Sequence, residues 1–370
     1  MPFFRSFLLL FFIVTILAGC DTAPEVFVEL DEGKFSGHID VPQQSWYTLA
    51  EGFKGKQGEN NIIGYNAANH SLDFYTISDK HIEFSQGIKF VFEGPGHIDE
   101  IRAVDYVNPD TIVVMSRFWL IMINESGQEI YRKNISTEPE NKVDGLDLSA
   151  YHPSAKQSEG NRIALIGNEL YLPLNYFGHE AYVDKKAYGK NVHLIGKLNI
   201  HTGKFAPLPI QYPEKFQKDL YGFSNNFQFN YAGDKIIYNF GGFPEVYVYS
   251  CKSGTTKVLK QTYDFPATPI AGAMEISEHM FLATNYNNSV IGWEGKWYYQ
   301  AVIPPTLGAS TSEIYLRAIN LKTGVEKLSR LPEKRVFIGM LSLPDGLYVP
   351  HVLASEDSIR YSRFNFQVTE

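Results

Sequence analysis

The chain has 370 residues, of which 44% are hydrophobic and 20% charged, proportions that are ordinary for a globular protein. Its 33 basic and 41 acidic residues give a net charge of −8, and no basic stripe alternates with aromatic side chains, which argues against a nucleic-acid partner. The chain has 23 tyrosines and 26 phenylalanines, and such side chains favour half-buried strands.

The first 20 residues have the layout of a bacterial lipoprotein signal. Arg5 gives a short positive start, residues 7–17 are almost entirely apolar, and two small residues precede Cys20, whose thiol would receive the lipid. An uncleaved membrane anchor is the alternative, but the apolar stretch is shorter than the ~20 residues that a spanning helix needs. We therefore expect a signal peptide over residues 1–19 and a lipidated tether over residues 20–33.

Short runs rich in Tyr, Phe, Val and Ile follow, separated by Gly, Asn, Asp and Pro, a pattern typical of an all-β protein. Five segments share one form: an apolar strand, a polar turn with a small residue or glycine, and a second strand. These segments lie at residues 62–75, 120–131, 194–204, 246–254 and 315–324. A further strand can be matched beside most of them, at residues 111–115, 169–174, 235–240 and 296–303.

A last unit spans residues 346–352 and 359–366, which makes six units of roughly 55 residues, near the ~50 of known four-stranded propeller repeats. The sequence therefore predicts a six-bladed β-propeller over residues 34–370. Residues 34–41 precede the first unit, and we expect them to pair with the last blade and close the ring. The longest irregular stretch, residues 137–161, is expected to be functional or mobile.

Several pieces of the chain resemble a known family. They are the signal ending at Cys20, the hairpin strand at 72–75, the Phe-Glu-Gly-Pro-Gly segment at 92–96 and residues 167–173. Together they look like a family of Bacteroidota lipoproteins catalogued as a domain of unknown function and similar to TolB-like six-bladed propellers. The resemblance implies that fold and an outer-membrane location, on the periplasmic or the surface side. It carries no known catalytic residues.

Standard catalytic and cofactor motifs are absent from the sequence. There is no Gly-x-Ser-x-Gly elbow, no P-loop and no dinucleotide fingerprint, and His179-Glu180 begins like a zinc-protease motif without its second histidine. We therefore expect no cofactor and no catalytic metal. Once Cys20 carries lipid, Cys251 has no disulfide partner, and we expect it to be a packed, inert thiol.

Two constellations keep other chemistry open. Carboxylate clusters could serve a glycosidase if two of them met about 5–10 Å apart, although exposed turns and loop ends are the usual explanation for such clusters. These clusters are Asp99 with Glu100, Asp144 with Asp147, and Glu356 with Asp357. A calcium ion on the axis would need oxygen ligands near the inner strands. The candidates are Asn175, Asn239 and Asn285, although each of them could instead be a turn residue.

Aromatic residues near strand ends are the candidates for ligand binding, because aromatic faces stack on sugars and peptides at little entropic cost. They are Trp46, Tyr176, Phe177, Tyr286, Trp297 and His351. The alternative for each of them is packing within a blade.

These observations favour a lipid-anchored propeller of the cell envelope that is not an enzyme and binds a glycan, a peptide or an envelope protein. One alternative is a glycan-acting enzyme that uses loop carboxylates such as Asp99 or Glu100 over the channel. Another is a structural spacer in a larger envelope complex. Fold and site are separate questions, so the sequence does not choose the ligand.

Overall fold

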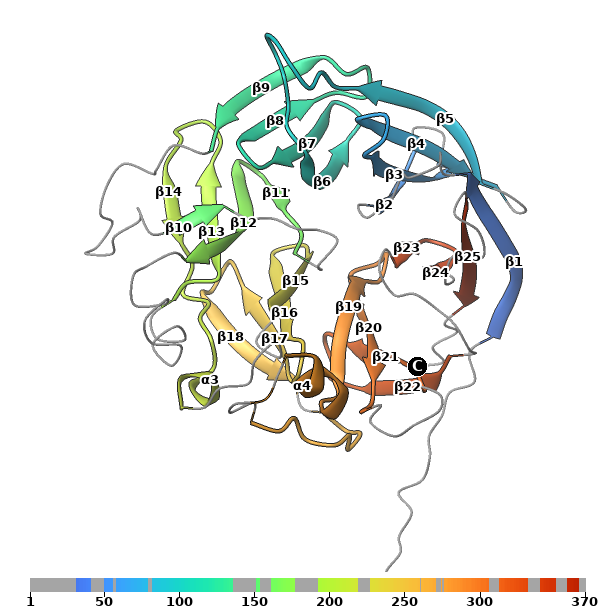
Figure 1. Cartoon of the computed structure of the whole chain (residues 1–370), viewed down its shortest axis with the longest axis vertical. Coiled ribbons are helices and arrows are strands. Elements are labelled where there is room, and N and C mark those ends of the chain that lie inside the picture. The colour runs from blue at the N-terminus through green and yellow to red at the C-terminus, as the bar shows by residue number, and fades with distance from the viewer. Residues whose placement is uncertain are drawn as a thin grey trace, which may run out of the picture.

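The computed structural model describes residues 31–40, 50–55, 58–78, 82–135, 151–153, 161–176, 192–218, 227–259, 261–270, 274, 276–305, 313–331, 340–350 and 358–365. Within these ranges six antiparallel sheets stand around one axis (Figure 1). The chain is therefore an all-β six-bladed propeller, which confirms the architecture predicted from the repeat.

In each of the first three blades, the strands follow one another from the axis to the rim. Blade 1 contains β2 (Ala50–Lys54), β3 (Asn60–Asn66), β4 (Ser71–Ile77) and β5 (Ile82–Lys89). Blade 2 contains β6 (Ile101–Asn108), β7 (Thr111–Ser116), β8 (Trp119–Ile123) and β9 (Glu129–Asn134). In blade 3 two short strands pair with the same neighbour: the blade contains β10 (Tyr151–Pro153), β11 (Ala164–Ile166), β12 (Glu169–Tyr176), β13 (Ile195–Asn199) and β14 (Phe205–Pro207).

The remaining blades have four strands each. Blade 4 contains β15 (Phe227–Ala232), β16 (Lys235–Phe240), β17 (Val246–Ser250) and β18 (Thr255–Leu259). Blade 5 contains β19 (Asn285–Ile291), β20 (Trp297–Ile303), β21 (Tyr315–Asn320) and β22 (Glu326–Arg330). Blade 6 contains β23 (Leu341–Leu343), β24 (Gly346–Pro350), β25 (Ser358–Asn365) and β1 (Asp31–Asp40).

The ring is closed by strands from opposite ends of the described chain. β1 is the outermost strand of blade 6 and pairs antiparallel with β25, with Gly37 opposite Tyr361. This pairing confirms the expectation for residues 34–41. It also covers an edge of β25 that would otherwise expose unpaired backbone groups.

Glycines close four of the five aligned hairpins, at the turns between the third and fourth strands of blades 2 to 5. They have φ between 70° and 79°, which favours glycine, and they are Gly127, Gly203, Gly254 and Gly324. The fifth hairpin, at residues 62–75, joins the second and third strands of blade 1, where His70 has φ 50°. The hairpin at residues 62–75 therefore lies one strand closer to the axis than the other four hairpins. The sequence pattern of a hairpin does not tell which two strands of a blade it joins.

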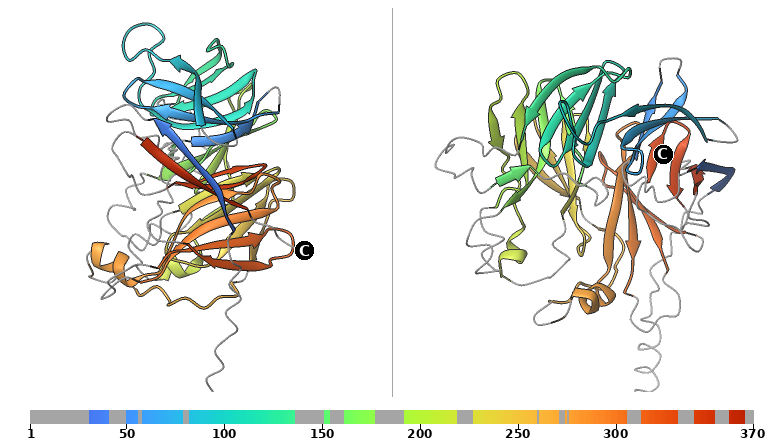
Figure 2. Two further views of the ribbon diagram at one scale, coloured as in Figure 1. Left: turned by 90° about the vertical axis from the view of Figure 1, so that its right-hand side faces the viewer. Right: turned by 45° about the horizontal axis from the view of Figure 1, so that its top comes forward.

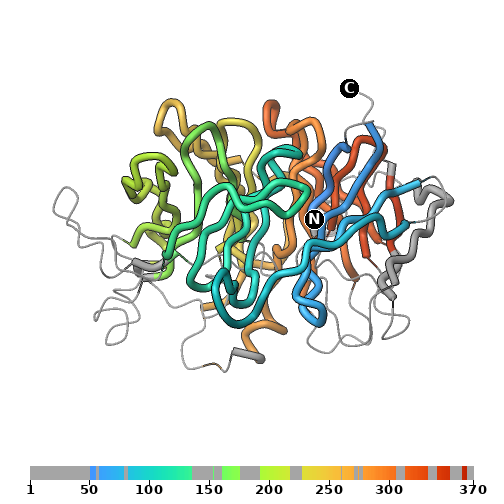
Figure 3. Tube along the Cα trace, turned by 90° about the horizontal axis from the view of Figure 1, so that it is seen from above, coloured from blue at the N-terminus to red at the C-terminus, as the bar shows by residue number. Residues whose placement is uncertain are grey.

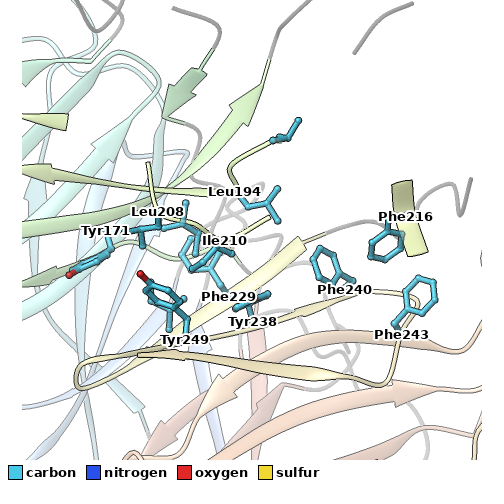
Figure 4. Packing of buried hydrophobic residues seen from close by; sticks show 13 residues of the cluster. Tyr171, Leu194, Leu208, Ile210, Phe216, Phe229, Tyr238, Phe240, Phe243 and Tyr249 are labelled. Carbon is cyan, nitrogen blue, oxygen red and sulfur yellow. The ribbon is translucent and has the colours of Figure 1, made fainter. Parts of the chain in front are cut away.

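The core lies between neighbouring blades, whose facing sheets bury apolar and aromatic side chains. Figure 4 shows the interface of blades 3 and 4, where Tyr171 and Leu194 approach Phe229 and Tyr249. Phe216, from the helix α3 (Glu214–Lys218), packs edge-on against Phe243 with ring centroids 4.8 Å apart. Aromatic pairs of this kind contribute about 0.5–1.5 kcal/mol beyond the area they bury.

The blades follow one another along the ring when it is seen edge-on (Figure 3). A second helix, α4 (Ile276–Leu282), projects from one face of the ring next to blade 5 (Figure 2). Within the part of the chain that the structure describes, no helix combines the length and apolarity required to cross a membrane.

Candidate functional site

A cavity of about 390 Å³ lies where the six blades meet at the axis. The innermost part of every blade contributes to its wall: Glu51 of β2, Asp105 of β6, Arg162 before β11, Asn230 of β15, Val290 of β19 and Leu341 of β23. Such axial cavities are common ligand sites because converging elements leave a concave, partly polar space. We therefore treat this cavity as the candidate site.

The sequence brings these strands close together by using small residues on the axis. A Cβ atom added to Gly52 of β2 would lie 2.6 Å from Cδ2 of Leu343 in β23, so a larger residue at position 52 would force the Leu343 side chain to move. In the neighbouring blade, Asp105 follows the apolar residues Ala103 and Val104 on the inner strand β6. Side chains alternate along a strand, so this register directs the Asp105 carboxylate into the cavity.

Glu51, Asp105 and Arg162 form a charged cluster in the cavity wall. The Arg162 guanidinium lies 4.0 Å from Oε1 of Glu51, and both side chains are about four-fifths buried. Glu51 Oε2 accepts a hydrogen bond from the backbone N–H of Tyr106 at 3.1 Å. Asp105 Oδ2 accepts one from the backbone N–H of Leu165 at 2.7 Å. Each carboxylate is therefore held in place by the neighbouring backbone.

Burial shifts the protonation of this acidic pair. Desolvation raises the pKa of Glu51, and the Arg162 charge opposes that rise. Desolvation also raises the pKa of Asp105 to about 8, and the charge of Glu51 adds to the effect. Two carboxylates in one buried site cannot both ionise easily, so we expect the pair to hold one proton at neutral pH.

Tyr231 of β15 also lines the cavity, and its hydroxyl is unsatisfied. Its oxygen is buried and has no hydrogen-bond partner within the described ranges, and desolvation raises its pKa well above the ordinary value. A buried polar atom without a partner costs about 1–3 kcal/mol, so such an atom in a native site indicates a partner that binds there. The neighbouring Asn230 is satisfied, because its amide donates to Ser289 Oγ at 2.8 Å.

The turn between β19 and β20 forms one rim of the cavity. The backbone N–H of Trp293 donates to Ser342 Oγ of blade 6 at 2.8 Å, while the indole is 42% exposed. Glu294 is exposed and pairs with Lys296 at 2.6 Å. The rim thus carries an aromatic face and a neutral ion pair.

Most of the predicted ligand-binding residues lie outside the part of the chain that the structure describes. Cys20, Trp46, Phe177 and His351 lie outside the described residues, as do the carboxylates at 144, 147, 356 and 357. Tyr176 ends β12, and its side chain also lies outside the description.

The two remaining aromatic candidates lie within blade 5. Tyr286 is buried, with the Arg317 guanidinium 5.9 Å from its ring centroid. Trp297 is half-buried at the start of β20, with the Lys327 ammonium 6.0 Å from its ring centroid. Neither ring is part of the cavity wall.

The three asparagines considered for an axial cation are dispersed. Asn239 donates to the Tyr286 carbonyl and accepts from the Tyr298 hydroxyl, each at 2.8 Å. Asn285 donates to carbonyls at the end of α4, and Asn175 is exposed on β12. Within the described ranges no three His, Cys, Asp or Glu side chains are grouped closely enough to hold a metal ion.

The carboxylate pair at 99–100 serves the neighbouring hairpin. Asp99 accepts hydrogen bonds from the Ser116 hydroxyl and from the backbone N–H of Arg117, the latter at 2.9 Å, while Glu100 is exposed. Cys251 is a half-buried free thiol whose pKa is raised by burial. Neither feature belongs to the cavity.

Sequence reasoning missed the residues that do meet there, namely Glu51, Asp105, Arg162 and Tyr231. One signal was present: Asp105 stands inside the apolar run Ala-Val-Asp-Tyr-Val, where a charge needs a reason. The other three have no comparable local signal.

Comparison with known proteins supports the fold. A family model described as a domain of unknown function, DUF4221, matches residues 40–267, more than half of the chain. The chain is also similar to the crystal structure of a DUF4221 family member from Bacteroides vulgatus, with a TM-score of 0.73 and 16% identity over 92% of this chain and 98% of that chain. No curated protein matches the sequence.

Two more distant structures are also similar to the chain. A luciferin-regenerating enzyme has a TM-score of 0.45 and 11% identity, over 90% of this chain and 96% of that one. The Cps50 (Swd1) β-propeller domain of Myceliophteria thermophila has a TM-score of 0.44 and 9% identity, over 85% of this chain and 83% of that one.

Proposed function

The chain belongs to the DUF4221 family, and we propose that it is a lipid-anchored propeller of the cell envelope that binds a small polar ligand in its axial cavity. The observation that carries the proposal is the buried hydroxyl of Tyr231, a residue that lines the cavity to which all six blades contribute; this hydroxyl has no hydrogen-bond partner among the described residues. Because no described group satisfies that hydroxyl, we expect a bound ligand to do so.

The dimensions and chemistry of the cavity support a small ligand over a polymer. A volume of about 390 Å³ lies at the lower end of the range typical of small-molecule sites. The wall offers the Glu51 and Asp105 carboxyls, the Arg162 guanidinium and the Tyr231 hydroxyl, while Trp293 gives an aromatic surface at the rim. A small number of polar groups that converge on one space can orient and select a small ligand.

The anchoring part of the proposal rests on the signal layout ending at Cys20. A lipid chain at this residue would tether the propeller to the envelope, with the outer membrane favoured by the family resemblance. Incorporation of labelled palmitate into the wild-type chain, lost in Cys20→Ser, tests the anchor. Protease shaving of intact cells then tells whether the domain faces the periplasm or the surface.

Tyr231→Phe tests the binding part. The ligand is sought by thermal denaturation of the full chain against sugars, amino acids, amines and short peptides. We expect a hit whose stabilisation falls in Tyr231→Phe, because the variant removes only the hydroxyl. Tyr65→Phe is the matched control, since its hydroxyl already bonds His70 Nδ1 at 2.9 Å away from the cavity. If no compound raises the melting temperature, the binding proposal fails.

A glycan-acting enzyme is a second candidate, supported by the Glu51–Asp105 pair. One carboxyl kept protonated beside one that ionises is an arrangement that acid–base catalysis uses. Turnover of a polysaccharide panel, lost in Glu51→Gln, would favour the enzyme. No turnover across the panel would favour binding alone.

A further inference from the structure

The charges that face the axial cavity do not balance. Its titratable groups are Glu51 from β2, Asp105 from β6, Arg162 beside β11, Tyr231 from β15 and Glu294 from the turn after β19, while β23 contributes only Leu341 and Ser342. Glu294 is neutralised at the rim by Lys296 at 2.6 Å. Among the described residues, two carboxylates therefore face one guanidinium inside the cavity, which leaves one negative charge in excess.

The protein compensates this excess only in part. Arg162 lies 4.0 Å from Glu51, a distance too long for a hydrogen bond. The backbone supplies one N–H to each carboxylate, from Tyr106 and from Leu165. Each carboxylate can accept about four hydrogen bonds, so acceptor capacity is left over in the cavity. A proton held by the pair then restores neutrality, in accord with the pKa of Asp105, which burial and Glu51 raise to about 8.

We propose that the ligand of this cavity is a small organic cation, whose primary ammonium group replaces the proton shared by Glu51 and Asp105. This inference rests on the binding role proposed above. An ammonium group has three N–H donors, and the carboxylates of Glu51 and Asp105 in the wall each have acceptor capacity left for them. The exchange keeps the buried charge at zero, because one cation enters as one proton leaves to solvent.

Other ligand classes fit this wall less well. An anion would meet the excess negative charge, with only Arg162 to attract it. A divalent metal would need more ligating side chains than the described residues group together. A neutral polyol could hydrogen-bond to the wall, but it would leave the proton in place.

Calorimetric titration of the full chain in detergent micelles tests the exchange. The probes are ethanolamine and 4-aminobutanol, each matched by a neutral diol of the same length, ethylene glycol and 1,4-butanediol. We expect the amines to bind more tightly than the diols. For an Asp105 pKa of about 8, amine affinity should rise about 25-fold between pH 6.5 and 8.5, because the proton must leave first. Buffers of different ionisation enthalpy should report release of nearly one proton at pH 6.5.

Two variants remove the exchange site without removing volume. Asp105→Asn and Glu51→Gln should each weaken amine binding at least tenfold and abolish its pH dependence. Asparagine has the shape of a protonated aspartate and keeps an acceptor for the Leu165 N–H, so Asp105→Asn should fold. Glu100→Gln is the matched control, because it neutralises an exposed carboxylate outside the cavity and should leave amine binding unchanged.

The outcomes separate this inference from the binding role on which it rests. If a diol or another neutral compound binds and the amines do not, the cation is wrong and the binding role stands. Amine binding that Asp105→Asn leaves unchanged, or that has no pH dependence, also overturns the exchange. If neither these probes nor any compound of the wider panel binds, both proposals fail.

Discussion

Arg317 and Glu326 form a buried ion pair between β21 and β22 of blade 5, and breaking it should be among the most destabilising single changes. Both side chains are 1% exposed. The Arg317 Nε donates to Glu326, and its Nη1 donates to the Pro244 carbonyl at 2.7 Å and to Gln300 Oε1 at 3.2 Å. Glu326 also accepts from the backbone N–H of Thr262.

Arg317→Met keeps an unbranched side chain of similar length but leaves Glu326 without its counter-ion. Breaking one half of a buried pair costs about 3–5 kcal/mol, because the remaining charge stays desolvated. Glu326→Gln leaves the Arg317 guanidinium without its counter-ion in the same way. In Arg317→Met/Glu326→Gln neither charge is left, so we expect a loss that is smaller than the sum of the two single losses by about 2 kcal/mol or more.

The assay is urea unfolding of the full chain and the three variants at neutral pH. Arg330→Met is the control, since the Arg330–Glu313 pair is exposed and should contribute less than about 1 kcal/mol. The reasoning is refuted if Arg317→Met costs no more than Arg330→Met. An additive double variant would equally refute it, because the cost would then not come from an uncompensated charge.

Three further predictions concern stability. Because the pKa of Asp105 is raised, the folded state holds a proton that the unfolded state releases, so the free energy of unfolding should fall as the pH rises from about 4 to about 8. Asp105→Asn should flatten this part of the plot of urea midpoint against pH. An unchanged slope in the variant would contradict the assignment of the proton to Asp105. Tyr231→Phe should leave the free energy of unfolding of the ligand-free chain unchanged or raise it, whereas Tyr65→Phe should lower it by about 1 kcal/mol in the same urea assay. Equal losses of stability in the two variants would show that the Tyr231 hydroxyl has a partner. Gly324→Ala should lower the free energy of unfolding by about 1 kcal/mol, because Gly324 has φ 78° while the space around its Cβ position is open, so backbone strain is the only penalty. Gly324→Asn should lower it less, since asparagine tolerates positive φ better than alanine. Equal unfolding midpoints for the wild type and Gly324→Ala would disprove the backbone strain.

The features of this fold that are local in sequence could be predicted. Tight turns need a residue that tolerates positive φ, so the glycines at 127, 203, 254 and 324 mark hairpins wherever the blades lie in space. Their spacing gave the number of units, and the strand-like segment left over before the first unit indicated how the ring closes. The shifted first hairpin shows the limit, because His70 closes its turn between different strands of the blade.

The candidate site depends on distances in space that no local pattern encodes. Glu51, Asp105 and Arg162 belong to three blades, and they meet because the twist and closure of the ring carry their strands to the axis. The same packing buries Tyr286 inside blade 5, although its position near a strand end resembled that of a ligand-binding residue. Alternation along a strand tells which residues share a face, but not which face meets the axis.

By itself, then, the sequence determined the class of the fold, the repeat and the closing strand, because turn chemistry and strand periodicity act over a few residues. Only the tertiary structure decided which acids become neighbours and which hydroxyl has no partner among the described residues. The pKa of Asp105 follows from that meeting, since desolvation and the charge of Glu51 exist only once the ring is closed.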